Sequence, residues 1–394
     1  MQNPTRTAGA FALCLWLFTG LACAPSGPNR AERSRMEAFV RSHSQPLDLS
    51  SPAAFRADLL DTAGKQIILL GESHGMPINN ELDLALLQWL HHNAGVRVYL
   101  GEVGHAAALL LNRYFETGDE RLLDLFFRAL RGTPAWNREY RDFLLRFRHW
   151  NASLPPSDRV RFVGVDTEHN PNFAIWALGE WVRESIDAGR STPASIAATV
   201  KRFTDIGNRI DAPEATKLLH DAPDHFAAHR TEWSRLLGPR LTDFEIIIEN
   251  LFQPTAGNRD FAIYETFLKL YPTFARERCY GRWGANHTAQ TPLEDKRWFA
   301  WYLNQPGSPV SGKVLSIQPF YEKAETLAQT GYGHYRVQSF SNTWFVPGLL
   351  AAGGGPVTLV RLEGPDSPFN AMPLSGMFQY AVLIRGATAS HPMD

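Results

Sequence analysis

Four short apolar segments, each followed closely by an acid or a histidine, constrain the fold of this chain more than any other feature. The segments are IILLGESHG (67–75), VRVYLGEVG (96–104), RVRFVGVDTEH (159–169) and CYGRWGANH (279–287). Each predicts a buried strand, and helical patterns separate the first three, as parallel-sheet units require. In an open parallel sheet the carboxyl ends of the strands face one crevice, where ligands bind. The sequence therefore predicts an α/β fold with a mainly parallel, mixed sheet flanked by helices.

The ends of these segments carry side chains suited to acid–base chemistry. The five candidates are Glu72, His74, Glu102, Asp166 and His287. Histidine is the side chain best suited to proton transfer near neutral pH. Each candidate also has a plain structural explanation, since a strand-end acid can cap a helix and a histidine can be a surface or core residue. Their convergence from distant parts of the chain nevertheless favours an enzyme over a generic globular domain.

The order of the predicted elements divides the 394 residues into four parts. We expect an export segment at 1–23, a tether and lead-in helix at 24–55, and an α/β catalytic core formed by 56–171 and 276–394. Residues 172–275 have helical patterns and almost no strand signal, which predicts a helical insertion between the third and fourth strands. The β-rich segments near the C-terminus lack long helices between them, so the sheet can finish with antiparallel strands.

Charge and cysteine content limit the partners. The formal net charge is −1 and there is no long basic run, which excludes a nucleic-acid partner and leaves a small-molecule substrate as the expectation. Of the three cysteines, Cys14 and Cys23 belong to the export segment, so Cys279 stands alone on a predicted strand. A single cysteine there is most simply a core residue, and no disulfide framework is available.

The N-terminus predicts export. Arg6 is followed by an apolar stretch at 8–22, which is short for a membrane span of ~20 residues but suits a signal-peptide core. Simple cleavage could follow Ala24. The sequence Gly-Leu-Ala-Cys ending at Cys23 resembles a bacterial lipobox, in which that cysteine is lipidated. We therefore expect a lipoprotein anchored to a membrane by its lipid, facing the periplasm from the outer membrane, or otherwise a secreted protein.

Five short motifs occur in a fixed order along the chain: GESHG, a strand-end Glu, GVD, a helix opened by Arg-Asp, and a Trp-Gly strand that ends in His. This ordered set, spread over residues 65–385, resembles the erythromycin esterase-like family. The family is part of a superfamily that also holds the ChaN-like haem-uptake lipoproteins and the Tiki metal-dependent peptidases. The resemblance implies a hydrolase that cleaves an ester or lactone.

The resemblance also implies roles for single residues. His74 corresponds to the general base that activates water against an ester or lactone carbonyl. Glu72 and Glu102 correspond to paired carboxylates that orient the histidine or bind the substrate, and we expect Glu102 to be the orienting one. His287 corresponds to a second histidine near the developing oxyanion. The supporting or substrate-binding positions are Asp166, Arg259 and Asp260.

One departure from the esterase pattern keeps other functions open. Only Ser73 separates Glu72 from His74, whereas the esterases have two residues there, and this spacing is similar to that of the haem-uptake branch. The main prediction is an exported, metal-independent hydrolase without a cofactor. One alternative is a metal-dependent hydrolase or peptidase of the Tiki type, with Zn or Mn held by Glu72, His74, Glu102 and His287. The other is a lipoprotein that binds haem or another apolar ligand and catalyses nothing.

Overall fold

The structure, a computed structural model, describes residues 29–206, 209, 213–251, 258–293, 295–331, 333–342, 353–371, 374 and 376–393. The predicted export segment, with Cys23, lies outside the described residues. Within the described ranges, no helix is both long enough and apolar enough to cross a membrane.

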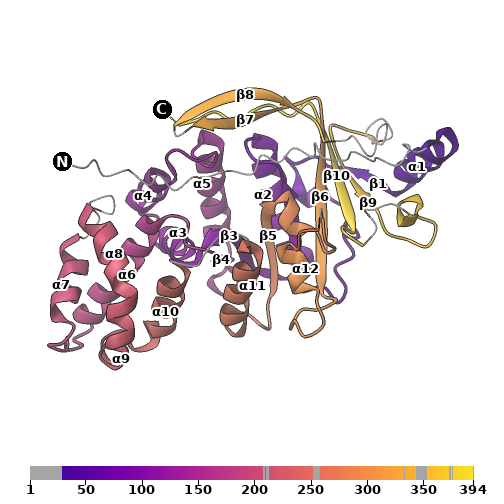
Figure 1. The fold of residues 1–394 in the computed structure, drawn as a ribbon. Helices are drawn as coiled ribbons and strands as arrows, with labels where there is room; N and C mark the ends of the chain where they lie inside the picture. The colour runs from indigo at the N-terminus through magenta and orange to yellow at the C-terminus, as the bar shows by residue number, and fades with distance from the viewer. Residues whose placement is uncertain are drawn as a thin grey trace.

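The described part of the chain is built on an eight-stranded sheet in the order β1-β9-β10-β6-β2-β5-β3-β4 (Figure 1). The strands are β1 (Ser44–Pro46), β2 (Ile67–Glu72), β3 (Val96–Gly104), β4 (Arg161–Asp166), β5 (Arg278–Gly284), β6 (Val314–Glu322), β9 (Val357–Arg361) and β10 (Tyr380–Arg385). Strand β9 runs antiparallel to both of its neighbours, and all other pairs are parallel. The predicted mainly parallel, mixed sheet is confirmed, and of the three C-terminal strands only β9 is reversed.

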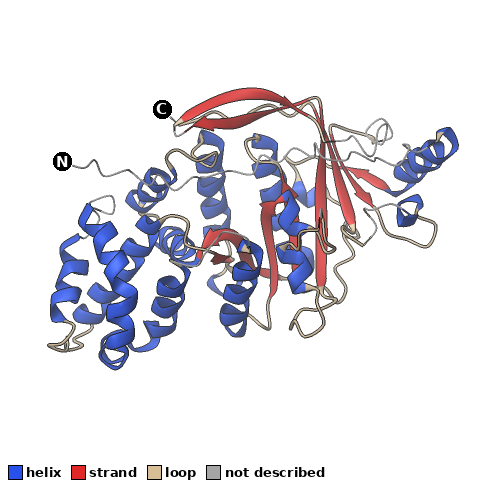
Figure 2. Ribbon diagram, viewed as in Figure 1, coloured by secondary structure: helices blue, strands red, loops and turns tan. Residues whose placement is uncertain are grey.

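Helices cover both faces of the sheet (Figure 2). Alternate residues of a strand point to opposite faces, and β2 shows the consequence. Ile68 and Leu70 pack in the core with α2 (Pro77–Ala94) and α5 (Arg138–Ser153), while Ile67 and Leu69 pack with α11 (Arg259–Leu270) and α12 (Phe299–Leu303). The remaining α-helices beside the sheet are α1 (Arg30–His43), α3 (His105–Thr117) and α4 (Glu120–Leu130).

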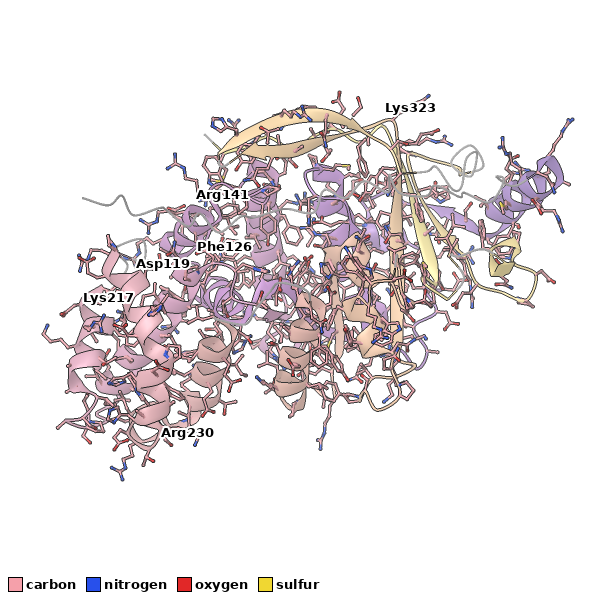
Figure 3. All side chains as sticks on the ribbon, viewed as in Figure 1. Asp119, Phe126, Arg141, Lys217, Arg230 and Lys323 are labelled. Atoms are coloured by element: carbon pink, nitrogen blue, oxygen red, sulfur yellow. The ribbon has the colours of Figure 1, made fainter. Side chains whose placement is uncertain are left out.

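A group of helices follows β4 and extends from one end of the sheet (Figure 1). It consists of α6 (Pro171–Asp187), α7 (Ala197–Ile206), α8 (Pro213–Ala228), α9 (Arg230–Leu237) and α10 (Leu241–Asn250). Aromatic side chains form its centre, where Trp233 stacks on Phe244 with ring centroids 5.1 Å apart. Figure 3 shows the labelled Lys217 and Arg230 on the outside of this group. The next helix, α11, packs on the sheet, and the predicted domain boundaries stay a prediction.

A separate hairpin arches over the carboxyl ends of the strands (Figure 1). It consists of β7 (Ala324–Gly331) and β8 (His334–Phe340), which pair antiparallel. The hydroxyl of Tyr335 donates to the carbonyl of Thr133 at 3.0 Å, and its ring stacks on Trp136. The hairpin therefore reaches from the end of β6 to the loop before α5. It was not predicted from the sequence.

We expect Gly75→Ala to lower the free energy of unfolding by about 2 kcal/mol or more. Gly75 has a φ of +82°, and a Cβ there would lie 2.4 Å from the carbonyl oxygen of Leu327 in the hairpin. Gly64→Ala is the matched control, because Gly64 has a φ of +67° with nothing within 4 Å, so only backbone strain of about 1 kcal/mol applies. Urea unfolding measures both, and equal losses would contradict the close approach of the hairpin.

Candidate active site

The sheet order brings the predicted site residues to one edge. Because β5 lies between β2 and β3, the order β2-β5-β3-β4 places the ends of all four predicted strands side by side. Glu72 ends β2, Glu102 lies near the end of β3, and Asp166 ends β4. His287 follows β5 in a short 3₁₀ helix, η5 (Ala285–Thr288). The start of α11 adds Arg259 and Asp260, so all seven predicted site residues lie around this edge.

His74 is held by Glu72. Its Nδ1 lies 2.6 Å from Glu72 Oε1, and the histidine side chain is 46% exposed while that of Glu72 is 13% exposed. A Cβ on Gly284 would lie 3.7 Å from His74 Nε2 and 3.5 Å from Glu102 Oε2, so Nε2 faces the space shared with Glu102. We predicted Glu102 as the orienting carboxylate, and the structure corrects this. Glu72 can reach the His74 ring because it ends β2 and His74 lies two residues later, in the turn that follows the strand.

The charges around Glu72 and His74 favour an ion pair. Burial raises the pKa of Glu72, but the Arg282 guanidinium and the bond to His74 outweigh it and lower that pKa to about 2. For His74, burial lowers the pKa, while the hydrogen bond and charge of Glu72 and the charge of Glu102 raise it above the ordinary value. Glu72 is therefore a carboxylate at any working pH, and His74 is a stronger base than a free imidazole.

The backbone of the 71–75 turn is fixed by side chains of three other elements. Asn79 on α2 donates from Nδ2 to the carbonyl of Ser73 at 2.7 Å. The hydroxyl of Tyr321, on β6, donates to Asn79 Oδ1 at 2.6 Å. Thr326, on the hairpin, donates from its hydroxyl to the carbonyl of His74 at 2.6 Å. His74 is thus presented from a turn with little freedom, as a catalytic side chain requires.

Glu102 belongs to a second charged group, formed with Arg259 and His287 at the same edge of the sheet. Its Oε1 accepts from Arg259 Nη2 at 2.9 Å, and its Oε2 accepts from the backbone N–H of Gly284 at 2.6 Å. His287 Nε2 lies 3.3 Å from Oε1. Burial raises the pKa of Glu102, but the charges of His287 and Arg259 outweigh it and lower that pKa. Glu102 is consequently an anion fixed by the Arg259 guanidinium and by its contact with His287.

Asp166 holds Arg259 in place through two contacts. It is fully buried, accepts from Arg259 Nε at 3.1 Å and also contacts Nη2, and lies 3.0 Å from His169 Nε2. Burial raises the pKa of Asp166, but Arg259 and then His169 hold it well below its usual range. Arg259 is thereby held between Asp166 and Glu102 while its side chain stays 30% exposed.

His287 lies between two carboxylates. Nδ1 is 2.6 Å from Asp260 Oδ1, an oxygen that also accepts from the backbone N–H of Phe299 at 2.7 Å. Burial lowers the pKa of His287, while the charges of Asp260 and Glu102 raise it above the ordinary value. The protonated ring can donate to both carboxylates, so this geometry favours an imidazolium that links Asp260 to Glu102.

Glu168 is a buried acid near this group that sequence reasoning missed. Its Oε1 accepts from the backbone N–H of Ala106 at 2.8 Å, at the start of α3, while Oε2 is buried without a partner among the described residues. Burial, helped by the charge of Asp166, raises the pKa of Glu168 to about 8. The side chain is thus protonated at neutral pH.

This acid predicts a pH dependence of stability with a definite sign. An unfolded Glu has a pKa near 4.5, so between about pH 4.5 and pH 8 unfolding releases its proton and the free energy of unfolding falls as pH rises. Glu168→Gln cannot release a proton. From pH 5 to pH 8, we expect the free energy of unfolding of the wild type to fall relative to that of Glu168→Gln by at least about 1 kcal/mol. Urea unfolding at the two pH values cancels constant packing costs, and parallel curves would contradict the assignment.

The four residues of the metal alternative do not fit a metal site. Among the residues that the structure describes, no group of three histidine, cysteine or acidic side chains could hold a metal ion. The two glutamates are already neutralised by protein cations, Glu72 by Arg282 at 3.1 Å and Glu102 by Arg259 at 2.9 Å. A divalent ion bound there would lie beside two guanidinium groups, which repel it.

Three solved structures share this fold over nearly the whole chain. A Bacillus cereus protein is 15% identical with a TM-score of 0.64, and a succinoglycan biosynthesis protein is 14% identical with a TM-score of 0.66; each match covers 93% of this chain and 100% of the other. A mutant of the erythromycin esterase EreC in its open conformation is 13% identical with a TM-score of 0.58, covering 90% of this chain and 98% of the esterase.

The comparisons therefore identify the fold by structure. A scan against protein-family models and a sequence search of curated proteins each find no match. The fold is erythromycin esterase-like, as the resemblance predicted.

Proposed function

We propose that this protein is a hydrolase that cleaves an ester or lactone with a water molecule activated by His74. The observation that carries the proposal is the His74–Glu72 pair. Glu72 holds Nδ1 at 2.6 Å, which leaves Nε2 of a half-exposed imidazole facing the space shared with Glu102. An imidazole with its proton on Nδ1 accepts the next proton at Nε2, as a general base must. The shared fold with an erythromycin esterase agrees with this class of reaction.

The reaction follows from the positions of the charges. His74 Nε2 takes a proton from water as the water oxygen attacks the carbonyl carbon, and the carbonyl oxygen becomes an oxyanion. Glu72 stabilises the imidazolium that forms. When the tetrahedral intermediate collapses, the carbon–oxygen bond to the leaving alcohol breaks and Nε2–H returns the proton to that alcohol.

The second charged group, around Arg259, supplies electrostatic stabilisation of the transition state. Arg259 is fixed by Asp166 and Glu102 and is the partly exposed cation of that group. His287 lies 3.4 Å from Arg259 Nη1, and its raised pKa favours a second positive charge there. Fixed cations placed before the reaction stabilise charge that develops on an oxyanion without reorganising. We assign this role to Arg259, with His287 and Asp260 holding Arg259 and Glu102 in place.

The surroundings of His74 favour this reaction over haem binding. The imidazole lies beside the carboxylates of Glu72 and Glu102, and both carboxylates raise its pKa. Clustered acids stabilise a histidine that takes up a proton, whereas they are a poor lining for the apolar face of a porphyrin.

A library of esters and lactones tests the proposal. We expect the purified protein to hydrolyse at least one compound, and His74→Ala to lose that hydrolysis. A haem titration run in parallel separates the two functions. A Soret band that shifts in His74→Ala, without turnover of any compound, would overturn the hydrolase proposal in favour of binding.

We further propose that the protein is exported and anchored by a lipid on Cys23. The support is the lipobox-like sequence that ends the apolar stretch at 8–22. Metabolic labelling with a palmitate analogue should mark the wild type but not Cys23→Ala. Equal labelling of both proteins would contradict the anchor, and an unlabelled protein released by the cell would favour simple secretion.

A further inference from the structure

Arg282 is a buried cation beside the proposed base, and the reaction above gives it no role. It lies on β5, in register with Leu70 of β2. Because side chains alternate along a strand, Arg282 points to the same face of the sheet as Leu70 and Glu72. Its side chain is only 11% exposed. A guanidinium at such a position is costly to bury unless its partners are fixed.

Two carboxylates share this guanidinium. Nη1 lies 3.1 Å from Glu72 Oε2, and Nε lies 3.3 Å from Asp83 Oδ2. Asp83 is fully buried on α2, and the same Oδ2 accepts from the hydroxyl of Tyr99 at 2.7 Å. Arg282 therefore joins the end of β2 to the covering helix α2.

Packing removes the remaining freedom of Arg282. Nη1 donates to Asn80 Oδ1 at 2.7 Å. The guanidinium carbon lies 5.9 Å from the ring centroid of Tyr140 and 5.5 Å from that of Phe143, both on α5. These contacts suit the flat, rigid guanidinium and could not all be made by lysine.

We propose that Arg282 is a positioning residue that fixes Glu72, which in turn fixes the tautomer and direction of His74. The inference rests on the proposed function of His74. Glu72 has one oxygen on each partner: Oε1 faces His74 Nδ1 and Oε2 faces Arg282. A carboxylate pinned at Oε2 presents Oε1 in one direction, so Nδ1 keeps its proton and Nε2 keeps its lone pair.

The positioning role can be separated from a purely structural one. The contact with Asp83 ties the sheet to α2, whereas the contact with Glu72 reaches the base. Asp83→Asn keeps an oxygen for Arg282 and Tyr99, because only Oδ2 has partners and Oδ1 has none among the described residues. Asp83→Asn therefore weakens the ion pair between Arg282 and Asp83 and leaves the contact between Arg282 and Glu72 in place.

The variant that tests the proposal is Arg282→Met combined with Asp83→Asn. Arg282→Met alone leaves the buried carboxylate of Asp83 unpaired and can unfold the protein, whereas replacing both partners of a buried pair is often tolerated. The readout is the tautomer of neutral His74 in ¹⁵N-histidine NMR spectra, recorded for each protein at a pH above the pKa of its own His74, with the signals assigned by their loss in His74→Gln. Circular dichroism confirms that each variant is folded.

We expect the wild type and Asp83→Asn to show the Nδ1–H tautomer of His74. The double variant should show the Nε2–H tautomer, which free histidine prefers, or a mixture of both. Retention of the Nδ1–H tautomer by the folded double variant would overturn the proposal, as would its loss in Asp83→Asn. This readout needs no substrate, so it stands or falls separately from the hydrolase activity.

Kinetics supply a second readout once a substrate is known. Loss of positioning should lower kcat of the double variant at least tenfold and leave KM within about twofold, because the base is misplaced while the substrate contacts remain. Arg282→Lys keeps the positive charge but lacks the several fixed N–H donors of the guanidinium, so its kcat should lie between that of the double variant and that of the wild type. Unchanged kcat in the double variant would contradict the positioning role.

Discussion

Alanine in place of His74 should lower kcat by ~10²–10⁴-fold on any ester or lactone that the protein hydrolyses. The reason is that Nε2 of His74 is the acceptor for the proton of the attacking water, while Glu72 occupies Nδ1. Steady-state kinetics measure the effect. KM should change little, since the substitution removes a group needed in the transition state.

The matched control for this substitution is His220→Ala. The His220 side chain is 83% exposed on α8, in the helical group that follows β4, and it is not among the site residues. We expect its kcat to equal that of the wild type within error. Added imidazole should restore part of the activity of His74→Ala, and full turnover by His74→Ala without imidazole would rule out His74 as the base.

Methionine in place of Arg259 should lower the free energy of unfolding by about 3–5 kcal/mol at pH 7. The substitution leaves Asp166, which is fully buried, and Glu102, which is 16% exposed, without the guanidinium between them. Urea unfolding measures the loss. It should shrink as pH falls, because an orphaned buried carboxylate has a raised pKa and can take up a proton.

A surface ion pair provides the control for this loss. Arg121 makes a paired contact with Asp119, but its side chain is 89% exposed. Arg121→Met should therefore cost no more than about 1 kcal/mol. Equal losses at Arg121 and Arg259 would show that the buried group contributes nothing beyond an ordinary surface pair.

The strand ends could be predicted from the sequence because their signals are local. A short apolar run with a Gly near its end and an acid as its last residue, as at Glu72 and Asp166, indicates both the strand and its end. The sheet order is different, since no local pattern places β5 between β2 and β3. That order and register decide which carboxylate reaches His74, which explains why Glu102 was predicted in the place of Glu72.

Arg282, Asp83 and Glu168 were missed for a related reason. Arg282 stands inside the apolar run at 279–287, and a charged residue in a buried strand was the one available signal. Asp83 belongs to a helix of mostly buried residues and Glu168 follows a strand, so each resembles an ordinary helix or loop acid. Their roles depend on partners far away in the chain, such as Tyr99 and Ala106.

The pH dependence of kcat/KM, compared between the wild type and Glu72→Gln, tests the central claim most directly. Only neutral His74 can act as the base, so kcat/KM should fall as pH falls through a pKa above the ordinary histidine value of 6.5. The substituted glutamine keeps an acceptor for Nδ1–H but lacks the negative charge that raises this pKa. In Glu72→Gln we expect the fall of kcat/KM on the acid side to occur at lower pH, and the maximum value of kcat/KM to be lower. If kcat/KM falls through the same pKa in both proteins, this would contradict the assignment of His74, held by Glu72, as the base.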